Sequence, residues 1–315
     1  MKLLISLIVL VISLMHCAGN SKQAENQVTR VVPTVTEIGN ETDTICSTRL
    51  LDAVMRNDTL EAIRILQNGC DVNTKLIIGY SYYAGDSTYQ TPLSNSPSFR
   101  MSLLLLESGA DPNIELGDYS PLELATILHD NKRVELLLKH KADVNHFNKF
   151  TNYQNALIAA ISTGNIEALE MLISNGAEFK AYANNIHDPI HKAIQHNQYE
   201  IARYLLSKGL DARVKVTPVN HEGEFGDCVP CPFGIEPIHS AVVLSDMLLA
   251  KKFINLLVEY NADVDAKNND GITPLGYIAA SGDAEIAEHL ISHGAKVSGS
   301  AIIQAAAYQN IDCLL

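Results

Sequence analysis

Seven segments of this 315-residue chain end in similar five-residue sequences, and this repetition limits the fold more than any other feature. The endings are GCDVN from Gly69, GADPN from Gly109, KADVN from Lys141, GAEFK from Gly176, GLDAR from Gly209, NADVD from Asn261 and GAKVS from Gly294. Their spacings are 40, 32, 35, 33, 52 and 33 residues. A period of this size predicts a solenoid, in which each unit buries its apolar face by stacking on its neighbours.

A helix-start signal precedes most of these endings. The signals are Thr91-Pro92-Leu93, Ser120-Pro121-Leu122, Asp188-Pro189-Ile190-His191, Glu236-Pro237-Ile238-His239 and Thr273-Pro274-Leu275. A Thr, Ser or Asp side chain accepts hydrogen bonds from free backbone N–H groups, and proline at the first helical position removes no donor that the helix would use. Glycines such as Gly109 and Gly176 supply the left-handed conformation that ends a helix. Each unit therefore contains two short helices.

The unit from Asn155 to Lys180 shows the apolar spacing of such a helix pair. Apolar residues recur at intervals of three and four along both predicted helices. They are Leu157, Ala160 and Ile161 in the first helix and Ile166, Leu169, Leu172 and Ile173 in the second.

The whole pattern resembles the ankyrin-repeat family, whose signature is TPLHxAA, a glycine, a second helix ending in LL, and GAxxN. The resemblance extends from Thr48 to Leu315, with His191 and His239 at the position of the family's structural histidine. Repeats are expected to begin near Thr48, Thr91, Ser120, Asn155, Asp188, Glu236, Thr273 and Ala301. The resemblance implies an all-α solenoid of about eight helix-turn-helix repeats with connecting hairpin loops, over residues 45–315, in which the last repeat is incomplete.

Two repeats and two connections depart from the regular pattern. Pro97 falls inside the expected first helix of the second repeat, which should be irregular. The sixth repeat should carry an extra turn near Leu244 to Ala250. The connections after the first and fifth repeats span 22 and 27 residues, and they are the elaborated loops. The family commonly binds partners beside its hairpins and its concave surface.

Aromatic residues gather in these connections and are the candidate partner-binding residues. Tyrosine suits binding hot spots because it offers a large rigid ring and a polar tip. The candidates are Tyr80, Tyr82, Tyr83 and Tyr89 in the first long connection, and Phe147, Phe150, Tyr153 and Tyr182 in ordinary ones. The alternative is that these rings pack the hairpins against their own repeats.

The second long connection contains Cys228 and Cys231 in a C-x-x-C motif. Such a pair can form a short disulfide, remain as free thiols, bind a metal with His221 and His239, or act as a redox dithiol. Pro230 and Pro232 place the motif in a loop rather than at the helix start typical of redox motifs, so a disulfide is favoured. Cys46 and Cys70 lie at the same end of the first repeat and form a second candidate pair.

The N-terminus has the pattern of an export signal. Lys2 precedes an apolar run of 13 residues from Leu3 to Met15, too short to span a bilayer but typical of a secretory h-region. Cys17 follows a lipobox-like LMH sequence and is a candidate for lipidation, with ordinary cleavage near Ala18 as the alternative. Residues 1–17 are therefore interpreted as a signal, and polar residues 18–44 as a flexible tether. The expected location is extracytoplasmic, in a periplasm or cell envelope of bacterial type, with or without a lipid anchor.

The composition and the motif search exclude several functions. A net charge of −13 and the lack of a basic stripe argue against nucleic-acid binding. No phosphate-binding loop, nucleophile elbow or H-E-x-x-H motif is present. His187, Asp188 and His191 resemble a triad only in sequence, because Asp188 is a predicted helix cap.

The prediction is a protein-binding scaffold that is not an enzyme and needs no cofactor. The alternatives are a redox or metal role at Cys228 and Cys231, or an inhibitor or immunity-type binder of an exported enzyme or toxin.

Overall fold

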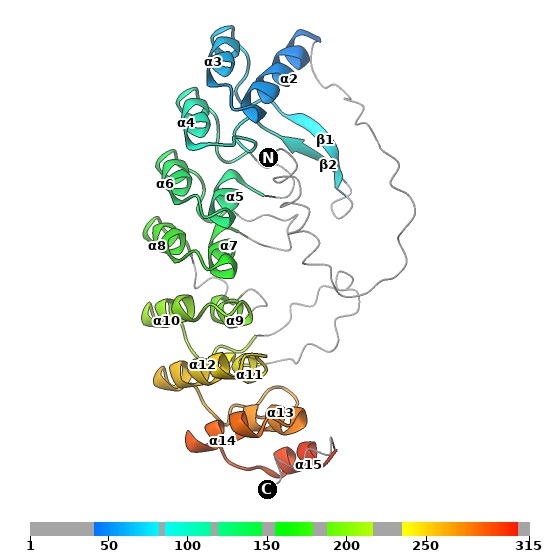
Figure 1. Ribbon diagram of the computed structural model, residues 1–315, viewed down its shortest axis with the longest axis vertical. Helices are drawn as coiled ribbons and strands as arrows, with labels where there is room; N and C mark the ends of the chain where they lie inside the picture. Colours follow the sequence, from blue (N-terminus) through cyan, green and yellow to red (C-terminus); the bar gives the residue numbers. More distant parts are fainter. Residues whose placement is uncertain are drawn as a thin grey trace. The chain divides into compact units, whose positions relative to one another are not determined.

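The computed structural model describes residues 41–81, 86–114, 119–146, 155–178, 188–216 and 235–307. Most of these residues form short helices joined in pairs by tight turns (Figure 1). The first helix, α2 (Glu41–Met55), begins inside the segment expected to be a tether, so the folded part starts earlier than residue 45. The rest of the expected signal and tether lies outside the described residues.

Six helix pairs and two partial repeats follow the order expected from the repeated endings. The pairs are α2 with α3 (Thr59–Gln67), α5 (Pro121–Ile127) with α6 (Asn131–Lys139), α7 (Ala156–Thr163) with α8 (Ile166–Ser174), α9 (Pro189–Gln195) with α10 (Tyr199–Ser207), α11 (Pro237–Val242) with α12 (Met247–Glu259), and α13 (Pro274–Ser281) with α14 (Ala284–Ser292). The second repeat contributes α4 (Phe99–Glu107), and the eighth contributes α15 (Gly299–Ala307). The fold is therefore the predicted array of helical repeats.

The predicted capping chemistry forms most first helices. Proline is the first residue of α5, α9, α11 and α13. The side chains of Ser120, Asp188 and Thr273 accept hydrogen bonds from backbone N–H groups of the helices that they precede. Glu236 differs, because in its capping box the backbone N–H of Glu236 donates to His239 Nδ1 at 3.2 Å. Its longer side chain is a poor N-cap compared with Thr, Ser, Asp or Asn.

The predicted helix stops are also present. Gly176 follows α8 with φ of +92°, a conformation that glycine adopts without the steric cost of a Cβ atom. The equivalent positions Lys141 and Asn261 have φ of +66° and +64°, so the same turn forms there without glycine.

The helices stack in two layers, each made from one helix of every regular repeat (Figure 1). One layer joins α5, α7, α9, α11, α13 and α15 in order, and the other contains α3, α4, α6, α8, α10, α12 and α14. Between the layers lie fully buried leucines and isoleucines such as Leu157, Ile161, Leu169 and Leu172, each at most 1% exposed. These four confirm the predicted apolar face. Ile166 does not, because it is the first residue of α8 and is 38% exposed.

Both irregular repeats differ from the others where the sequence predicts it. Residues 92–95 of the second repeat form a turn instead of a first helix, and the chain becomes helical only at Phe99. In the sixth repeat α12 has 13 residues, whereas the second helices of the other described repeats have nine. Its extra turn is the one expected near Leu244 to Ala250.

Candidate partner-binding site

The first long connection forms a β-hairpin between the first and second repeats (Figure 1). Strand β1 (Leu76–Ser81) pairs antiparallel with β2 (Asp86–Gln90), from Leu76 opposite Gln90 to Ser81 opposite Asp86. The register shifts between Ile77 and Gly79, where one strand carries an extra residue. The backbone of Tyr80 lies opposite Ser87 and that of Tyr89 opposite Ile77. Two of the four predicted tyrosines are thus placed in paired strands, and their side chains lie outside the described structure.

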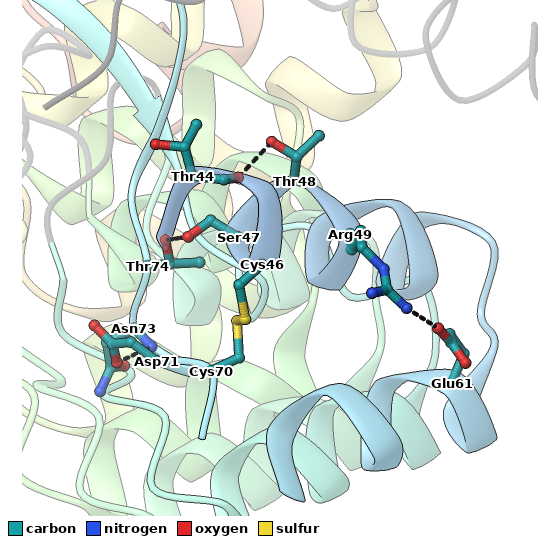
Figure 2. The surroundings of a disulfide bond; sticks show 10 residues. All are labelled: Thr44, Cys46, Ser47, Thr48, Arg49, Glu61, Cys70, Asp71, Asn73 and Thr74. Carbon is teal, nitrogen blue, oxygen red and sulfur yellow. Dashed lines mark hydrogen bonds and ion pairs between the residues drawn. A yellow bond between two sulfur atoms is a disulfide. The ribbon is translucent and has the colours of Figure 1, made fainter. Parts of the chain in front are cut away.

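A disulfide between Cys46 and Cys70 cross-links the first repeat just before the hairpin begins (Figure 2). The Cα atoms of the two cysteines are 5.9 Å apart, and the bond joins α2 to the turn after α3. Just before β1, the hydroxyl of Thr74 donates a hydrogen bond to the hydroxyl of Ser47 on α2. The predicted pairing of Cys46 with Cys70 is confirmed. The hairpin therefore follows directly after a first repeat whose two helices are cross-linked.

Asparagine side chains link the first four repeats to one another at the points where their connections begin. The amide of Asn73 donates to the carbonyl of Gly109 at 3.2 Å, and its Oδ1 accepts from the backbone N–H of Asp111 at 2.7 Å. The same pair of bonds recurs from Asn113 and Asn145, each to the next repeat. This asparagine ladder of Asn73, Asn113 and Asn145 holds successive connections at fixed spacing. It was not predicted, although the asparagine that ends three of the repeated endings is visible in the sequence.

The second long connection leaves the repeats at a single bridge between Val216 and Ile235. Beside it lies Glu236, whose Oε1 is 3.9 Å from Lys215 Nζ. Burial raises the pKa of Glu236, and the charge of Lys215 lowers it in part. The loop itself, with His221, Cys228 and Cys231, lies outside the described residues.

Asp188 and His191 make a buried capping pair rather than an accessible catalytic one. Asp188 Oδ1 accepts from the backbone N–H groups of Ile190 and His191 and lies 3.0 Å from His191 Nδ1. The two side chains are 1% and 2% exposed, so no substrate reaches them. The predicted capping role of Asp188 is confirmed, and His187 lies outside the described residues.

The other predicted site residues are not placed by the structure. Those outside the described ranges are Cys17, Tyr82, Tyr83, Phe147, Phe150, Tyr153 and Tyr182. Within the described ranges, no three His, Cys, Asp or Glu side chains are grouped closely enough to hold a metal ion. None of the described helices is both long and apolar enough to cross a membrane.

The stacked helix pairs, the turns that link them and the projecting hairpin define a helical-repeat solenoid. A family model described as ankyrin repeats (3 copies) matches residues 125–216 and 225–315, which is more than half of the chain. The chain belongs to the ankyrin-repeat family. Ankyrin repeats generally mediate protein–protein interaction, and the fold is typically a non-enzymatic scaffold.

Individual relatives and a solved structure agree with this assignment. An ankyrin repeat protein of Rickettsia felis is 28% identical over 213 residues, covering 64% of this chain and 49% of the relative. The mouse ankyrin repeat and SOCS box protein 5 is 27% identical over 139 residues, covering 44% of this chain and 36% of the relative. The chain thus spans about half or less of these relatives. The crystal structure of the human ASB11 ankyrin repeat domain matches with a TM-score of 0.57 at 18% identity, covering 79% of this chain and 99% of that domain.

Proposed function

We propose that this protein is an extracytoplasmic scaffold that binds another protein through its first hairpin, its aromatic connections and its concave face. The observation that carries the proposal is the hairpin of residues 76–90, which replaces a short connection and starts from the Cys46–Cys70 disulfide. The rings proposed to contact the partner are those of Tyr80, Tyr82, Tyr83, Tyr89, Phe147, Phe150, Tyr153 and Tyr182.

A fixed hairpin base favours binding for an entropic reason. Association costs free energy when loops must be ordered at the interface, and a loop that is already held has less freedom to lose. The ladder from β1 to β2 and the Thr74–Ser47 hydrogen bond both restrict the backbone that carries Tyr80 and Tyr89. Rings on such a backbone can contribute roughly 2 kcal/mol each when they are buried by a partner.

The charge distribution favours a basic partner surface. An exposed carboxylate occurs at the third position of most of the repeated endings, in Asp71, Asp111, Asp143, Asp211 and Asp263. Together with the net charge of −13, this row would raise the association rate of a cationic protein and repel an anionic one.

Two features support a location outside the cytoplasm. Disulfides such as Cys46–Cys70 persist in oxidising compartments and are rare where thiols are kept reduced. The apolar run from Leu3 to Met15 has the length of a secretory h-region. Lipidation at Cys17 belongs to the same proposal and would tether the repeats to a membrane surface.

The experiment is a comparison of partner recovery by whole-chain variants. Replacing Tyr80, Tyr82 and Tyr83 together by Ala should abolish recovery of a cross-linked partner from the cell envelope, quantified by mass spectrometry, while the melting temperature stays within about 2 °C. The matched control is Arg203→Ala, which removes a 62% exposed side chain from α10 and should leave recovery unchanged. Wild-type recovery by the tyrosine variant would contradict the proposed site, and a large fall in melting temperature would assign the rings to internal packing.

A further inference from the structure

Two histidines lie one helical turn apart at the C-terminal end of α14, where His293 is the residue that follows the helix. His289 and His293 are four residues apart, so their side chains project from the same face of the helix. Their ring centroids are 4.7 Å apart, and their planes meet at 60°. Both side chains are partly exposed and therefore accessible from solvent.

Hydrogen bonds fix which nitrogen of each ring carries the proton. His293 Nδ1 lies 2.8 Å from the carbonyl oxygen of His289. Because a carbonyl oxygen only accepts, this nitrogen must be the N–H donor, and Nε2 keeps its lone pair. His289 Nε2 lies 2.9 Å from Oδ1 of Asn255 on α12, so it too is the donor, and His289 Nδ1 keeps its lone pair. Each ring thus retains one nitrogen able to bind a metal.

The cationic side chain near His289 is that of Lys251 on α12, and it is paired with a carboxylate. The positive charge of Lys251 is offset by Glu285, whose Oε2 is 2.8 Å from Lys251 Nζ.

We propose that His289 and His293 form a two-histidine site for a divalent first-row transition metal. Imidazole suits Cu²⁺, Ni²⁺ and Zn²⁺, whereas Mg²⁺ and Ca²⁺ prefer oxygen ligands. Metal-binding histidines commonly donate their second ring N–H to a carbonyl or carboxylate, as both rings already do here to His289 O and Asn255 Oδ1. No third His, Cys, Asp or Glu joins the pair among the described side chains, so water or a group from another molecule completes the coordination.

The test measures Ni²⁺ binding by the whole chain in isothermal titration calorimetry. His289→Gln and His293→Gln should each weaken binding at least tenfold. The matched control is His140→Gln, which removes a similarly exposed histidine beyond the end of α6 and should stay within twofold of wild type. Mg²⁺ should produce no binding signal. Cu²⁺ electron paramagnetic resonance gives an independent readout, with two imidazole nitrogens in wild type and one in each variant.

A measurement on the wild-type protein tests the proposal without depending on whether the variants fold. Ni²⁺ should protect His289 and His293, but not His140, from diethylpyrocarbonate modification, as mapped by peptide mass spectrometry. Equal modification of His289 and His293 with and without Ni²⁺ would overturn the proposal. Ni²⁺ binding that is unchanged in both glutamine variants, or that disappears in a Cys228→Ser, Cys231→Ser double variant, would overturn it as well.

Discussion

Arg133 Nη1 donates a hydrogen bond of 2.7 Å to the carbonyl oxygen of Ser96, which lies 37 residues earlier in the chain. Arg133 is only 8% exposed, and its Nε is 3.2 Å from Asp130 Oδ2. The turn at 92–95 stands where a first helix would satisfy its own backbone groups, so its carbonyls need other donors. Arg133, which belongs to the third repeat, supplies one of these donors and so stabilises the shortened second repeat.

Replacing Arg133 by Met should therefore destabilise the protein. The Ser96 carbonyl would lose a charged donor while remaining buried, which costs about 2 kcal/mol. The free energy of unfolding in urea, followed by circular dichroism, measures the loss. Arg203→Met, which removes an exposed arginine from α10, should change stability by less than about 0.5 kcal/mol. Equal effects of the two substitutions would contradict the supporting role of Arg133.

Replacing Asn113 by Ala should break the asparagine ladder at its centre. Asn113 accepts from the backbone N–H of Asp143 at 2.7 Å and donates to the carbonyl of Lys141 at 3.1 Å. Losing both bonds should cost about 1–2 kcal/mol in unfolding free energy. Asn269, an exposed asparagine in the connection before α13, is the control, and Asn269→Ala should be nearly neutral. A neutral Asn113→Ala would show that water replaces the ladder without cost.

Replacing Glu236 by Thr should stabilise the sixth repeat. Thr273 caps the next first helix by accepting from Gly276 N–H at 3.2 Å, and Thr at position 236 could do the same for α11. The gain should be about 1 kcal/mol, and the control Thr273→Ala should lose a similar amount. Burial raises the folded pKa of Glu236, because the ionised carboxylate is poorly solvated in the folded state. Glu236 therefore lowers the free energy of unfolding little at low pH, where it is protonated, and most once the carboxylate ionises. The advantage of Glu236→Thr in urea unfolding should therefore grow from pH 4 to pH 7; an advantage that shrinks over this range would refute the pKa argument.

His239 should make stability fall on acidification. Its Nδ1 accepts from the backbone N–H of Glu236, and its Nε2 donates to the carbonyl of Ile272 in the next connection, so the neutral ring links two repeats. Burial lowers the folded pKa of His239 below its ordinary 6.5, although the hydrogen bond donated to the Ile272 carbonyl partly opposes this. The unfolded chain thus takes up a proton first, and the stability from neutral His239 is complete above about pH 6.5 and lost below it.

The measurement compares urea midpoints at pH 7.0 and pH 5.5. His239→Gln should be less stable than wild type at pH 7.0 but should lose less on acidification. His140→Gln should keep the wild-type slope. A His239→Gln profile parallel to wild type would locate the acid sensitivity elsewhere.

Removing the Cys46–Cys70 bond should loosen the first repeat. The disulfide closes a loop between residues 24 apart, and the chain-entropy estimate for such a loop is about 3 kcal/mol. A Cys46→Ser, Cys70→Ser double variant should lose that amount in unfolding free energy. Thiol titration of denatured, unreduced wild type should leave both cysteines unreactive, and labelling of either one would contradict the bond.

The repeated endings and the proline signals were enough to predict the array of helix pairs, because each is a local rule of helix starts and stops. Pro97 likewise predicted an irregular first helix in the second repeat, where residues 92–95 form a turn. Arg133 could not be assigned, because its partner lies in another repeat and becomes visible only when α4 and α6 are packed. Ile166 was misassigned, because spacing alone does not show that the first residue of α8 lies at the edge of the layer.

The candidate site could be predicted only in part. The place of Cys46 and Cys70 at the same end of the first repeat indicated their proximity, and the 22-residue length of the first long connection indicated an elaborated loop. The strand register, with its shift at Ile77, depends on pairing that the tyrosine pattern does not encode. The metal-binding arrangement of His289 depends on Asn255 from another helix, which the spacing of the two histidines does not reveal.

In the other complete pairs, the first helix packs on the first helix of the next repeat. α2 has no such neighbour, because residues 92–95 of the second repeat form a turn in place of a first helix. The first repeat and its hairpin are joined to the second repeat through the packing of α3 on α4 and through the two hydrogen bonds of Asn73. Force applied by a partner bound at the hairpin would therefore reach the rest of the array through these contacts.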